Sequence, residues 1–258
     1  MKLAEIGEYA RLGLLVANPR EVARAKRSDG ELCARFRDGR RFALRGGHSD
    51  FHVFRRIFLS DEYRLRGSRT WDTVIDLGGN AGCFAFRIAT QARRVFVYEP
   101  DPFNLAILER NLAGLRHVVV VPQAVAAQPG TRTLHTAASR DWAGRSTLFA
   151  DLSTARAHSA VEVRVTTLDA LFAEHAIERC DLLKIDVEGA EYEILGAASA
   201  GTLARIDRLV GEYHDVCPED PRTRIDAFRA FLEQAGFRVD TAPSRRHANT
   251  GLFFAERT

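Results

Sequence analysis

The sequence predicts an α/β fold in which helices cover a mostly parallel β-sheet. Strand-like apolar runs and helix-like periodic segments alternate from Trp71 onward, which is typical of a parallel sheet. A glycine-rich turn, "GGNAG", stands between the first of these strands and the first helix. The chain has 258 residues, of which 46% are hydrophobic, so it can bury a substantial core. It has no apolar run near the roughly 20 residues that span a bilayer.

The first half of the expected sheet has clear boundaries. Asp101 can cap the free N–H groups of its second helix, Pro102 supplies a preset first turn, and Gly114 follows the helix end. The order strand, helix, strand, helix, strand corresponds to residues 73–77, 83–91, 95–98, 102–113 and 118–121.

The alternation resumes after a weakly periodic stretch. Residues 123–160 are expected to be mostly loop, with a short strand at 131–136, and to shape a substrate pocket. The next elements are expected at 161–165 (strand), 168–177 (helix), 182–187 (strand), 190–198 (helix) and 208–214 (strand). Pro221 should open a last helix that Gly236 closes, and 237–242 with 251–257 should add an antiparallel edge.

The residues before Trp71 differ in composition and are expected to form an N-terminal helical lead, 1–70, ahead of the main domain, 71–258. Ten Arg or Lys lie between Arg11 and Arg45, against four acids. A nucleic-acid patch is one interpretation. We favour a solvated helical face, because no aromatic residues or recognition motif accompany the charge. Asp50 and Tyr63 are expected to line a lid over a ligand.

The cysteines and the first residues indicate the compartment. No pair has CxxC spacing, so neither a zinc knuckle nor a disulfide framework is indicated, and we expect free thiols. The first 20 residues contain early acids and no small-residue cleavage site, so we expect no signal peptide and a cytoplasmic, non-membrane protein. The four cysteines are Cys33, Cys83, Cys180 and Cys217.

The stretch "VIDLGGNAGCFAF", residues 74–86, indicates a ligand that lies against the backbone. A dinucleotide fingerprint, G-x-G-x-x-G, fits poorly. Counted from Gly78, its second glycine position is Asn80 and its last is Cys83. This mismatch disfavours a diphosphate and, with it, a nicotinamide-dependent oxidoreductase.

Acids at the ends of the first two strands suggest another ligand. Asp76 could hold an ammonium group, although it could instead cap the next helix. Glu99 suits the two hydroxyls of a ribose, although it could be a surface acid. Ammonium, carboxylate and ribose without phosphate describe S-adenosylmethionine (SAM). The expected cofactor-binding residues are Asp76, Gly78, Asn80, Gly82, Glu99, Pro100 and Asp186, with Gln123 at the adenine edge.

Several motifs in this order carry a family resemblance. They are "VIDLGGNAGCFA", "VYEPDPFN", "TTLDAL", "LLKIDVEGAEYEIL" and "GEYHD", with "GGHSDFHVFRRIFLSDEY" ahead of them. Together they resemble the FkbM-type family of class I SAM-dependent methyltransferases, from Phe42 to the C-terminus. The resemblance implies a Rossmann-like sheet of seven strands and methyl transfer, commonly to an oxygen of a sugar or secondary metabolite. Residues before Phe42 and at 128–160 match no family segment, so the acceptor stays open.

The segment "LLKIDVEG" places Lys184, Asp186 and Glu188 on one face of a strand and its exit. Lys184 is one of three lysines among 37 basic residues. A buried ammonium group is costly, so we expect it to pair with Asp186 or another acid, in either a structural or a catalytic role. Glu191 is expected to serve the first turn of the next helix.

The candidate catalytic residues are Asp186, Glu212 and His214, with Lys184 as a fourth. In the favoured mechanism His214 is the general base for an acceptor hydroxyl and a carboxylate orients its ring. In the alternative, Asp186, Glu212 and His214 bind a divalent cation that acidifies the hydroxyl. A catalytically silent SAM-binding or RNA-binding module is the competing function. We expect a small-molecule acceptor rather than nucleic acid.

Overall fold

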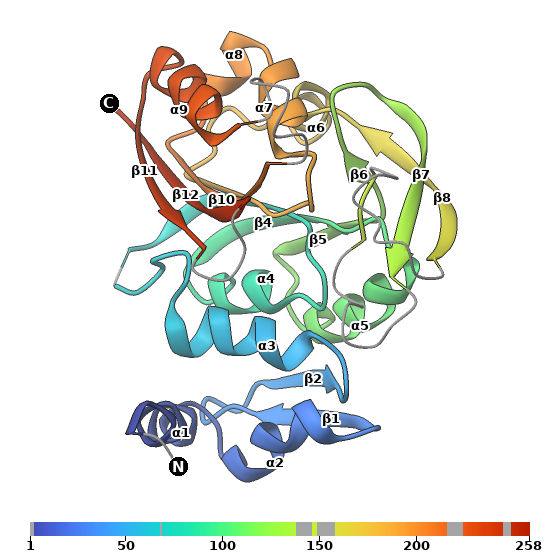
Figure 1. Cartoon of the computed structure of the whole chain (residues 1–258), viewed down its shortest axis with the longest axis vertical. Helices are drawn as coiled ribbons and strands as arrows, with labels where there is room; N and C mark the ends of the chain where they lie inside the picture. The colour runs from blue at the N-terminus through green and yellow to red at the C-terminus, as the bar shows by residue number, and fades with distance from the viewer. Residues whose placement is uncertain (1–2, 68, 138–145, 149–157, 216–223, 245–248) are drawn as a thin grey trace.

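The computed structural model describes residues 3–67, 69–137, 146–148, 158–215, 224–244 and 249–258. Its centre is a seven-stranded sheet with the strand order β11-β12-β10-β9-β3-β4-β5 (Figure 1). The chain therefore has the α/β fold that the sequence predicts. The strands are β3 (Trp71–Leu77), β4 (Ala92–Tyr98), β5 (Val118–Val121), β9 (Leu182–Ile185), β10 (Arg208–His214), β11 (Phe237–Pro243) and β12 (Thr250–Arg257).

The sheet is parallel except at β12. This strand pairs antiparallel with β10 on one side and with β11 on the other. The expected antiparallel pair is present, but β12 is inserted between β10 and β11, so β11 alone forms that edge. Placing the last strand inside the sheet buries Phe253 and Ala255 completely, which explains why its sequence is so apolar.

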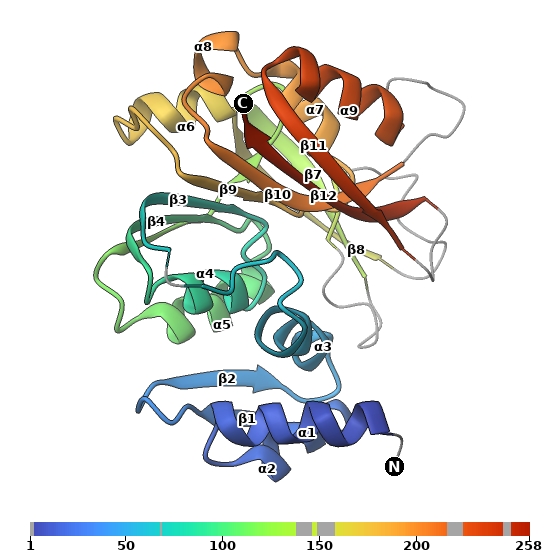
Figure 2. The same cartoon turned by 90° about the vertical axis from the view of Figure 1, so that its left-hand side faces the viewer.

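Helices cover both faces of the sheet (Figure 2). Helices α4 (Cys83–Ile88) and α5 (Pro102–Leu112) cover one face, and α6 (Leu168–Glu174), α7 (Glu191–Ala197), α8 (Ala200–Leu203) and α9 (Ile225–Gln234) cover the other. Each face has its own hydrophobic core. The predicted cap of α5 is confirmed, since the Asp101 carboxylate accepts a hydrogen bond from the Phe103 N–H at 2.9 Å. Pro221, the expected start of α9, lies outside the described residues.

The region expected to be mostly loop contains a second, smaller sheet. Strands β6 (Ala124–Val125), β7 (Gly130–Ala137) and β8 (His158–Thr166) form it, and β7 pairs antiparallel with β8 over its full length. The short strand predicted at 131–136 is thus a fragment of a longer hairpin. Its partner extends the strand predicted at 161–165. Of the stretch between them, the structure describes residues 146–148.

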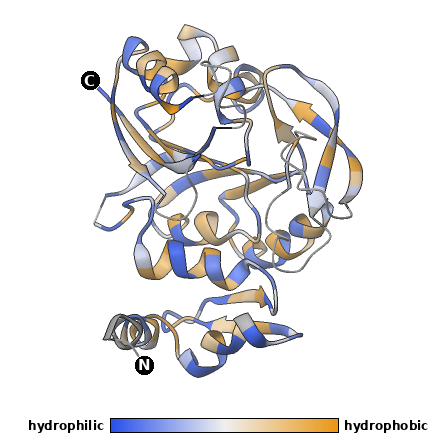
Figure 3. Cartoon of the chain, viewed as in Figure 1, coloured by the Kyte–Doolittle hydropathy of each residue, from blue (hydrophilic) through white to orange (hydrophobic). Residues whose placement is uncertain are grey.

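The N-terminal lead is helical as expected and also contains a β-hairpin that the sequence did not predict. Strands β1 and β2 pair antiparallel, and the Asn111 side chain of α5 hydrogen-bonds both the N–H and the C=O of Ala43 in β2. Apolar and hydrophilic residues alternate along α3, as in a helix with one buried face (Figure 3). The elements are α1 (Leu3–Leu15), α2 (Pro19–Arg24), a 3₁₀ turn (Ala25–Arg27), β1 (Glu31–Arg35), β2 (Arg41–Arg45), α3 (Asp50–Phe54) and a π-helical segment η2 (Arg55–Ser60).

The lead packs on the main domain through a shared core. The Phe42 ring meets the Phe86 ring of α4 with centroids 5.0 Å apart, and both side chains are buried. Three of the four cysteines, Cys33, Cys83 and Cys180, are free thiols, and Cys217 lies outside the described residues. Within the described ranges, none of the helices has the length and apolar character needed to cross a membrane.

Candidate active site

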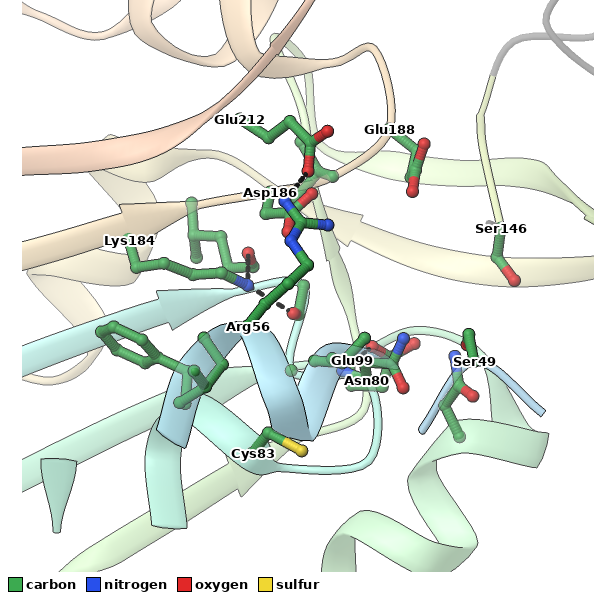
Figure 4. Close-up of a pocket in the computed structure, with 18 of the residues that line it drawn as sticks. Ser49, Arg56, Asn80, Cys83, Glu99, Ser146, Lys184, Asp186, Glu188 and Glu212 are labelled. Carbon is green, nitrogen blue, oxygen red and sulfur yellow. Dashed lines mark hydrogen bonds and ion pairs between the residues drawn. The ribbon is translucent and has the colours of Figure 1, made fainter. Parts of the chain in front are cut away.

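A cavity of about 830 Å³ opens at the carboxyl ends of β3, β4, β9 and β10. The lead closes its other side with residues of α3, of η2 and of the turn before α3, including Ser49 in that turn and Arg56 in η2 (Figure 4). Small-molecule sites usually measure roughly 300–1,000 Å³, so this space is large enough for a cofactor together with an acceptor.

The glycine turn forms the floor of this cavity. Gly78 has a φ of +83°, and a Cβ added there would lie 1.9 Å from the Asp186 carbonyl oxygen, so the turn passes directly against the exit of β9. Gly78 and Asn80 line the cavity. Gly82, also a predicted cofactor residue, is absent from the described lining and instead begins α4 with a left-handed φ of 88°. Its role is therefore in the backbone turn.

Glu99 lies where the sequence places it, in the cavity wall after β4. Its two carboxylate oxygens accept hydrogen bonds from the N–H groups of Asn80, at 2.6 Å, and Asp101, at 2.9 Å. Burial raises the pKa of Glu99 to about 7. These two hydrogen bonds fix the carboxylate against the glycine turn and leave it further lone pairs with which to accept hydrogen bonds from a ligand.

Pro100 and Gln123 also line this end of the cavity, and their contact with an adenine stays a prediction. The region 128–160, which matched no family segment, contributes Ser146 and Leu148 to the lining. The Ser146 hydroxyl donates to the Asp101 carboxylate at 2.7 Å, which ties this short segment to the start of α5.

Asp76 and Lys184 form a buried ion pair, with Nζ and Oδ1 3.0 Å apart. They are register partners on β3 and β9. Lys184 Nζ also donates to the carbonyl oxygens of Leu77, at 3.2 Å, and Gly78, at 2.6 Å. Burial opposes its charge, but Asp76 and Asp186 outweigh it and raise the pKa of Lys184. The sequence predicted that Lys184 pairs with Asp186 or with another acid, and in the structure the ion-pair partner is Asp76.

This pairing changes the interpretation of Asp76. Its carboxylate is fully buried and is not among the described residues that line the cavity, whereas Lys184 is. The charge of Asp76 is directed at Lys184, and the Lys184 ammonium in turn holds the carbonyl groups of the glycine turn. The pair therefore braces the floor of the cavity.

Asp186 and Glu212 lie together at the other end of the cavity (Figure 4). Burial opposes the charge of Asp186, but Lys184, Arg56 and His214 lower its pKa below the usual value. The Tyr63 hydroxyl donates to this carboxylate at 2.9 Å. Burial and the charge of Asp186 raise the pKa of Glu212 to about 7. Two adjacent carboxylates thus differ in their affinity for a proton.

His214 lies away from the cavity lining that the structure describes. Its Nδ1 is 3.1 Å from Glu191 Oε1, and its Nε2 is 3.3 Å from Glu188 Oε2. Burial would lower the pKa of His214, but these two carboxylates outweigh it and raise the pKa well above the usual value. A ring held as a cation between two acids cannot accept a proton from a substrate, and this placement opposes the general-base role that the sequence favoured.

The divalent-cation alternative finds no support in the same geometry. Across the described segments, no three His, Cys, Asp or Glu side chains are grouped so that they could hold a metal ion. Both ring nitrogens of His214 already face carboxylates, which removes the nitrogen ligand from the proposed set.

Two site residues were not found from the sequence. Arg56 and Glu62 come from η2 and the residues after it, and Arg56 Nη2 is 2.7 Å from Glu212 Oε2 and also contacts Glu62. Tyr63 was expected at the ligand, and it lines the cavity. Asp50 was expected beside it, but its carboxylate is paired with Arg45 at 2.7 Å. The stretch "RRIFLSDEY" has neither a motif nor a periodicity that singles out Arg56.

The strand order and the cavity at the carboxyl ends of the strands define the class I methyltransferase fold. A solved structure titled methyltransferase FkbM, from Methylobacillus flagellatus, shares this fold with a TM-score of 0.50. It is 13% identical, and the match covers 78% of this chain and 47% of that one.

Residues 76–239 match the family model described as the methyltransferase FkbM domain, and the chain belongs to this family. The resemblance seen in the sequence is thereby confirmed, and the nicotinamide oxidoreductase alternative is wrong.

Two named relatives match similar shares of the chain. The 31-O-demethyl-FK506 methyltransferase FkbM of Streptomyces tacrolimicus is 29% identical over 202 residues, which cover 67% of this chain and 77% of the relative. The AMB antimetabolite synthetase AmbE of Pseudomonas aeruginosa is 28% identical over 227 residues, 73% of this chain. That match spans 10% of the length of AmbE, so this chain resembles one segment of a far longer protein.

Proposed function

We propose that this protein transfers the methyl group of SAM to a hydroxyl oxygen of a small molecule, such as a sugar or a secondary metabolite. The observation that carries the proposal is that the two ends of one cavity are lined by different groups. Glu99 and the glycine turn stand at one end, and two carboxylates with different proton affinities, Asp186 and Glu212, stand at the other.

The residues at the glycine turn fit SAM. The Glu99 carboxylate would accept hydrogen bonds from the two ribose hydroxyls, and Pro100 and Gln123 would contact the adenine. Gly78 and Asn80 let the ligand approach the backbone. Since Asp76 is paired with Lys184, we assign the positive end of the cofactor to Asp186, a carboxylate that lines the cavity and whose pKa is lowered.

The two carboxylates of the acceptor end then have separate tasks. SAM supplies an electrophilic methyl group when bound. The acceptor oxygen forms a bond to this methyl carbon while the carbon–sulfur bond breaks, and Glu212 takes the proton that the hydroxyl releases. A carboxylate whose pKa is about 7 suits this transfer near neutral pH, whereas Asp186 remains ionised. Positioning the two reactants would supply much of the remaining rate.

The charge of the cavity favours a neutral acceptor. Six acids of the described residues line it, among them Asp186, Glu188 and Glu212, against the three cations Arg55, Arg56 and Lys184, so a phosphate or carboxylate on the acceptor would meet an excess of like charge. The name of the Streptomyces relative specifies an oxygen, 31-O, which supports an oxygen acceptor here too. Residues 1–70 would form the lead that covers the site, and residues 71–258 the methyltransferase domain.

A transfer assay tests this function. The protein would be incubated with methyl-labelled SAM and a panel of neutral sugars and polyketides, with sugar phosphates and RNA as contrasting acceptors. We expect label in a neutral hydroxyl compound and equimolar S-adenosylhomocysteine. Label in RNA would overturn the acceptor class, and binding of S-adenosylhomocysteine without transfer to any acceptor would indicate the silent module.

A further inference from the structure

The segment from Arg56 to Tyr63 lies outside the residues that the family model matches, 76–239, yet it forms one wall of the cavity. Its first part is a π-helical turn, η2, a form that is rare and frequent at functional sites. Asp61 follows with a φ of 54°, a left-handed conformation that costs a non-glycine residue energy. This wide turn places Arg56 over the carboxyl ends of β9 and β10 (Figure 4).

Arg56 makes two carboxylate contacts there. Its Nη2 atom donates to Glu212 Oε2 at 2.7 Å, and its Nε and Nη2 atoms donate to the two oxygens of Glu62. The side chain of Arg56 is 26% exposed, and those of Glu62 and Glu212 are 10% and 16% exposed. Because a planar guanidinium held by Glu62 has little freedom, its contact with Glu212 restricts that carboxylate to one orientation.

The charges around Glu212 make this contact consequential. Asp186, directly after β9, repels its negative charge, while Arg56 and His214 favour it. Lys184 and Glu188 also stand at this end of the cavity, and the Tyr63 hydroxyl donates its hydrogen bond to Asp186 rather than to Glu212. The guanidinium is thus the one cation that touches Glu212 among the described residues, and without it burial and Asp186 would favour the protonated acid.

We propose that Arg56 is a positioning residue for methyl transfer, which holds the Glu212 carboxylate in the orientation and charge state in which it takes the acceptor's proton. This inference rests on the proposed role of Glu212 as the base. It assigns part of the acceptor site to the lead, to a segment before the family's matched region.

The test compares Arg56→Met and Arg56→Lys with Arg64→Met. Arg64 belongs to the same segment but is 54% exposed and pairs with Asp240 at the surface. With the acceptor that the transfer assay identifies, Arg56→Met should lose about 10- to 100-fold in kcat at pH 7, with a smaller change in KM. The acidic limb of its pH profile should move up by about one unit, which accounts for about fivefold of the loss at pH 7; this part should be recovered near pH 9, whereas the part due to lost orientation should remain. Arg56→Lys should restore part of the loss, and Arg64→Met should match wild type.

A second readout needs no acceptor. In protein labelled with ¹³C at the glutamate carboxyl carbon, the resonance missing from Glu212→Gln identifies Glu212. Its titration midpoint should lie higher in Arg56→Met than in wild type. An unmoved midpoint, or an equal loss of kcat at every pH, would overturn the role of Arg56. Full activity in Glu212→Gln would instead refute the proposed base, whatever the midpoint shows.

Discussion

The two ends of the cavity are built in different ways. At the cofactor end, the Glu99 carboxylate, directly after the neighbouring strand β4, accepts main-chain hydrogen bonds from Asn80 in the glycine turn and from Asp101. At the acceptor end, Asp186 and Glu212 depend on side chains from a distant segment, Arg56 and Tyr63. The first end is thus fixed by local chain geometry, and the second by an ion pair and a hydrogen bond between side chains more than a hundred residues apart in the sequence.

This difference predicts how each end responds to substitution. A change in the glycine turn should disturb the backbone and therefore the fold, whereas a change among the acceptor-end charges should leave the fold and alter the chemistry. Variants at the two ends, each with a matched control, test this difference in stability and turnover.

The largest effect is expected at Gly78. In Gly78→Ala the new Cβ would lie 1.9 Å from the backbone carbonyl oxygen of Asp186, on a residue with a φ of +83°. Because neither backbone segment can move freely in a buried sheet, we expect a loss of unfolding free energy on the order of 5 kcal/mol. Urea denaturation measures it.

Gly39 provides the control, since its φ is +89° and a Cβ there would meet nothing within 4 Å. Gly39→Ala should cost only about 1 kcal/mol, the backbone term alone. Equal losses in the two variants would show that the close approach to β9 has no energetic weight.

The next effect is expected from the ion pair beneath the turn. Lys184→Met leaves the fully buried Asp76 carboxylate without its partner, which should cost about 3–5 kcal/mol of unfolding free energy at pH 7. Adding Asp76→Asn should recover much of this loss, because the uncompensated charge disappears. A double variant no more stable than Lys184→Met would contradict a structural pair and point to another function of the lysine.

The same contrast explains what the sequence could predict. The alternating strands, the Asp101 cap, and the positions of Gly78 and Glu99 depend on neighbours in the chain, and these predictions agree with the structure. The β1–β2 hairpin was missed because short amphipathic strands have weak local signals, and it is held by Asn111 of α5. The occlusion of His214 depends on Glu191 of α7 and on Glu188 of the loop before that helix, both of which approach its ring. Strand register put it near the site, but it could not show which groups its ring would meet.

At the acceptor end, Glu212→Gln should reduce turnover on the order of 10²- to 10⁴-fold while the affinity for S-adenosylhomocysteine stays within a few-fold. The amide keeps the shape of the side chain but cannot take a proton. Glu256→Gln, at an acid 47% exposed on β12, is the control and should match wild type.

His214→Ala should lower the melting temperature, since Glu191 loses a buried partner, and retain most turnover. If His214→Ala lost turnover as Glu212→Gln does, the base would have to be reassigned.

The smallest effect concerns Glu99 and is visible as a pH dependence of cofactor-product binding. The pKa of Glu99 is raised to about 7 by burial, so the acid gains its proton as the pH falls through 7. Two ribose hydroxyls donate best to the ionised form, so S-adenosylhomocysteine should bind more weakly at pH 6 than at pH 8, by about tenfold at most. The ligand's own carboxyl group stays ionised in this range, and the ammonium group of a free amino acid loses its proton mainly above it.

Glu212 complicates that measurement, because its pKa is also about 7. Calorimetric titrations of three proteins separate the two acids. Glu99→Gln should bind S-adenosylhomocysteine more weakly by about 1.5–3 kcal/mol at pH 8, the value of a hydrogen bond to a charged acceptor, with little dependence on pH. Glu212→Gln should keep the wild-type dependence, because the proton that matters for the ribose is on Glu99. If the pH dependence of binding instead vanished in Glu212→Gln and persisted in Glu99→Gln, S-adenosylhomocysteine binding would depend on the protonation of Glu212. The division of the cavity into two independently built ends would then be wrong.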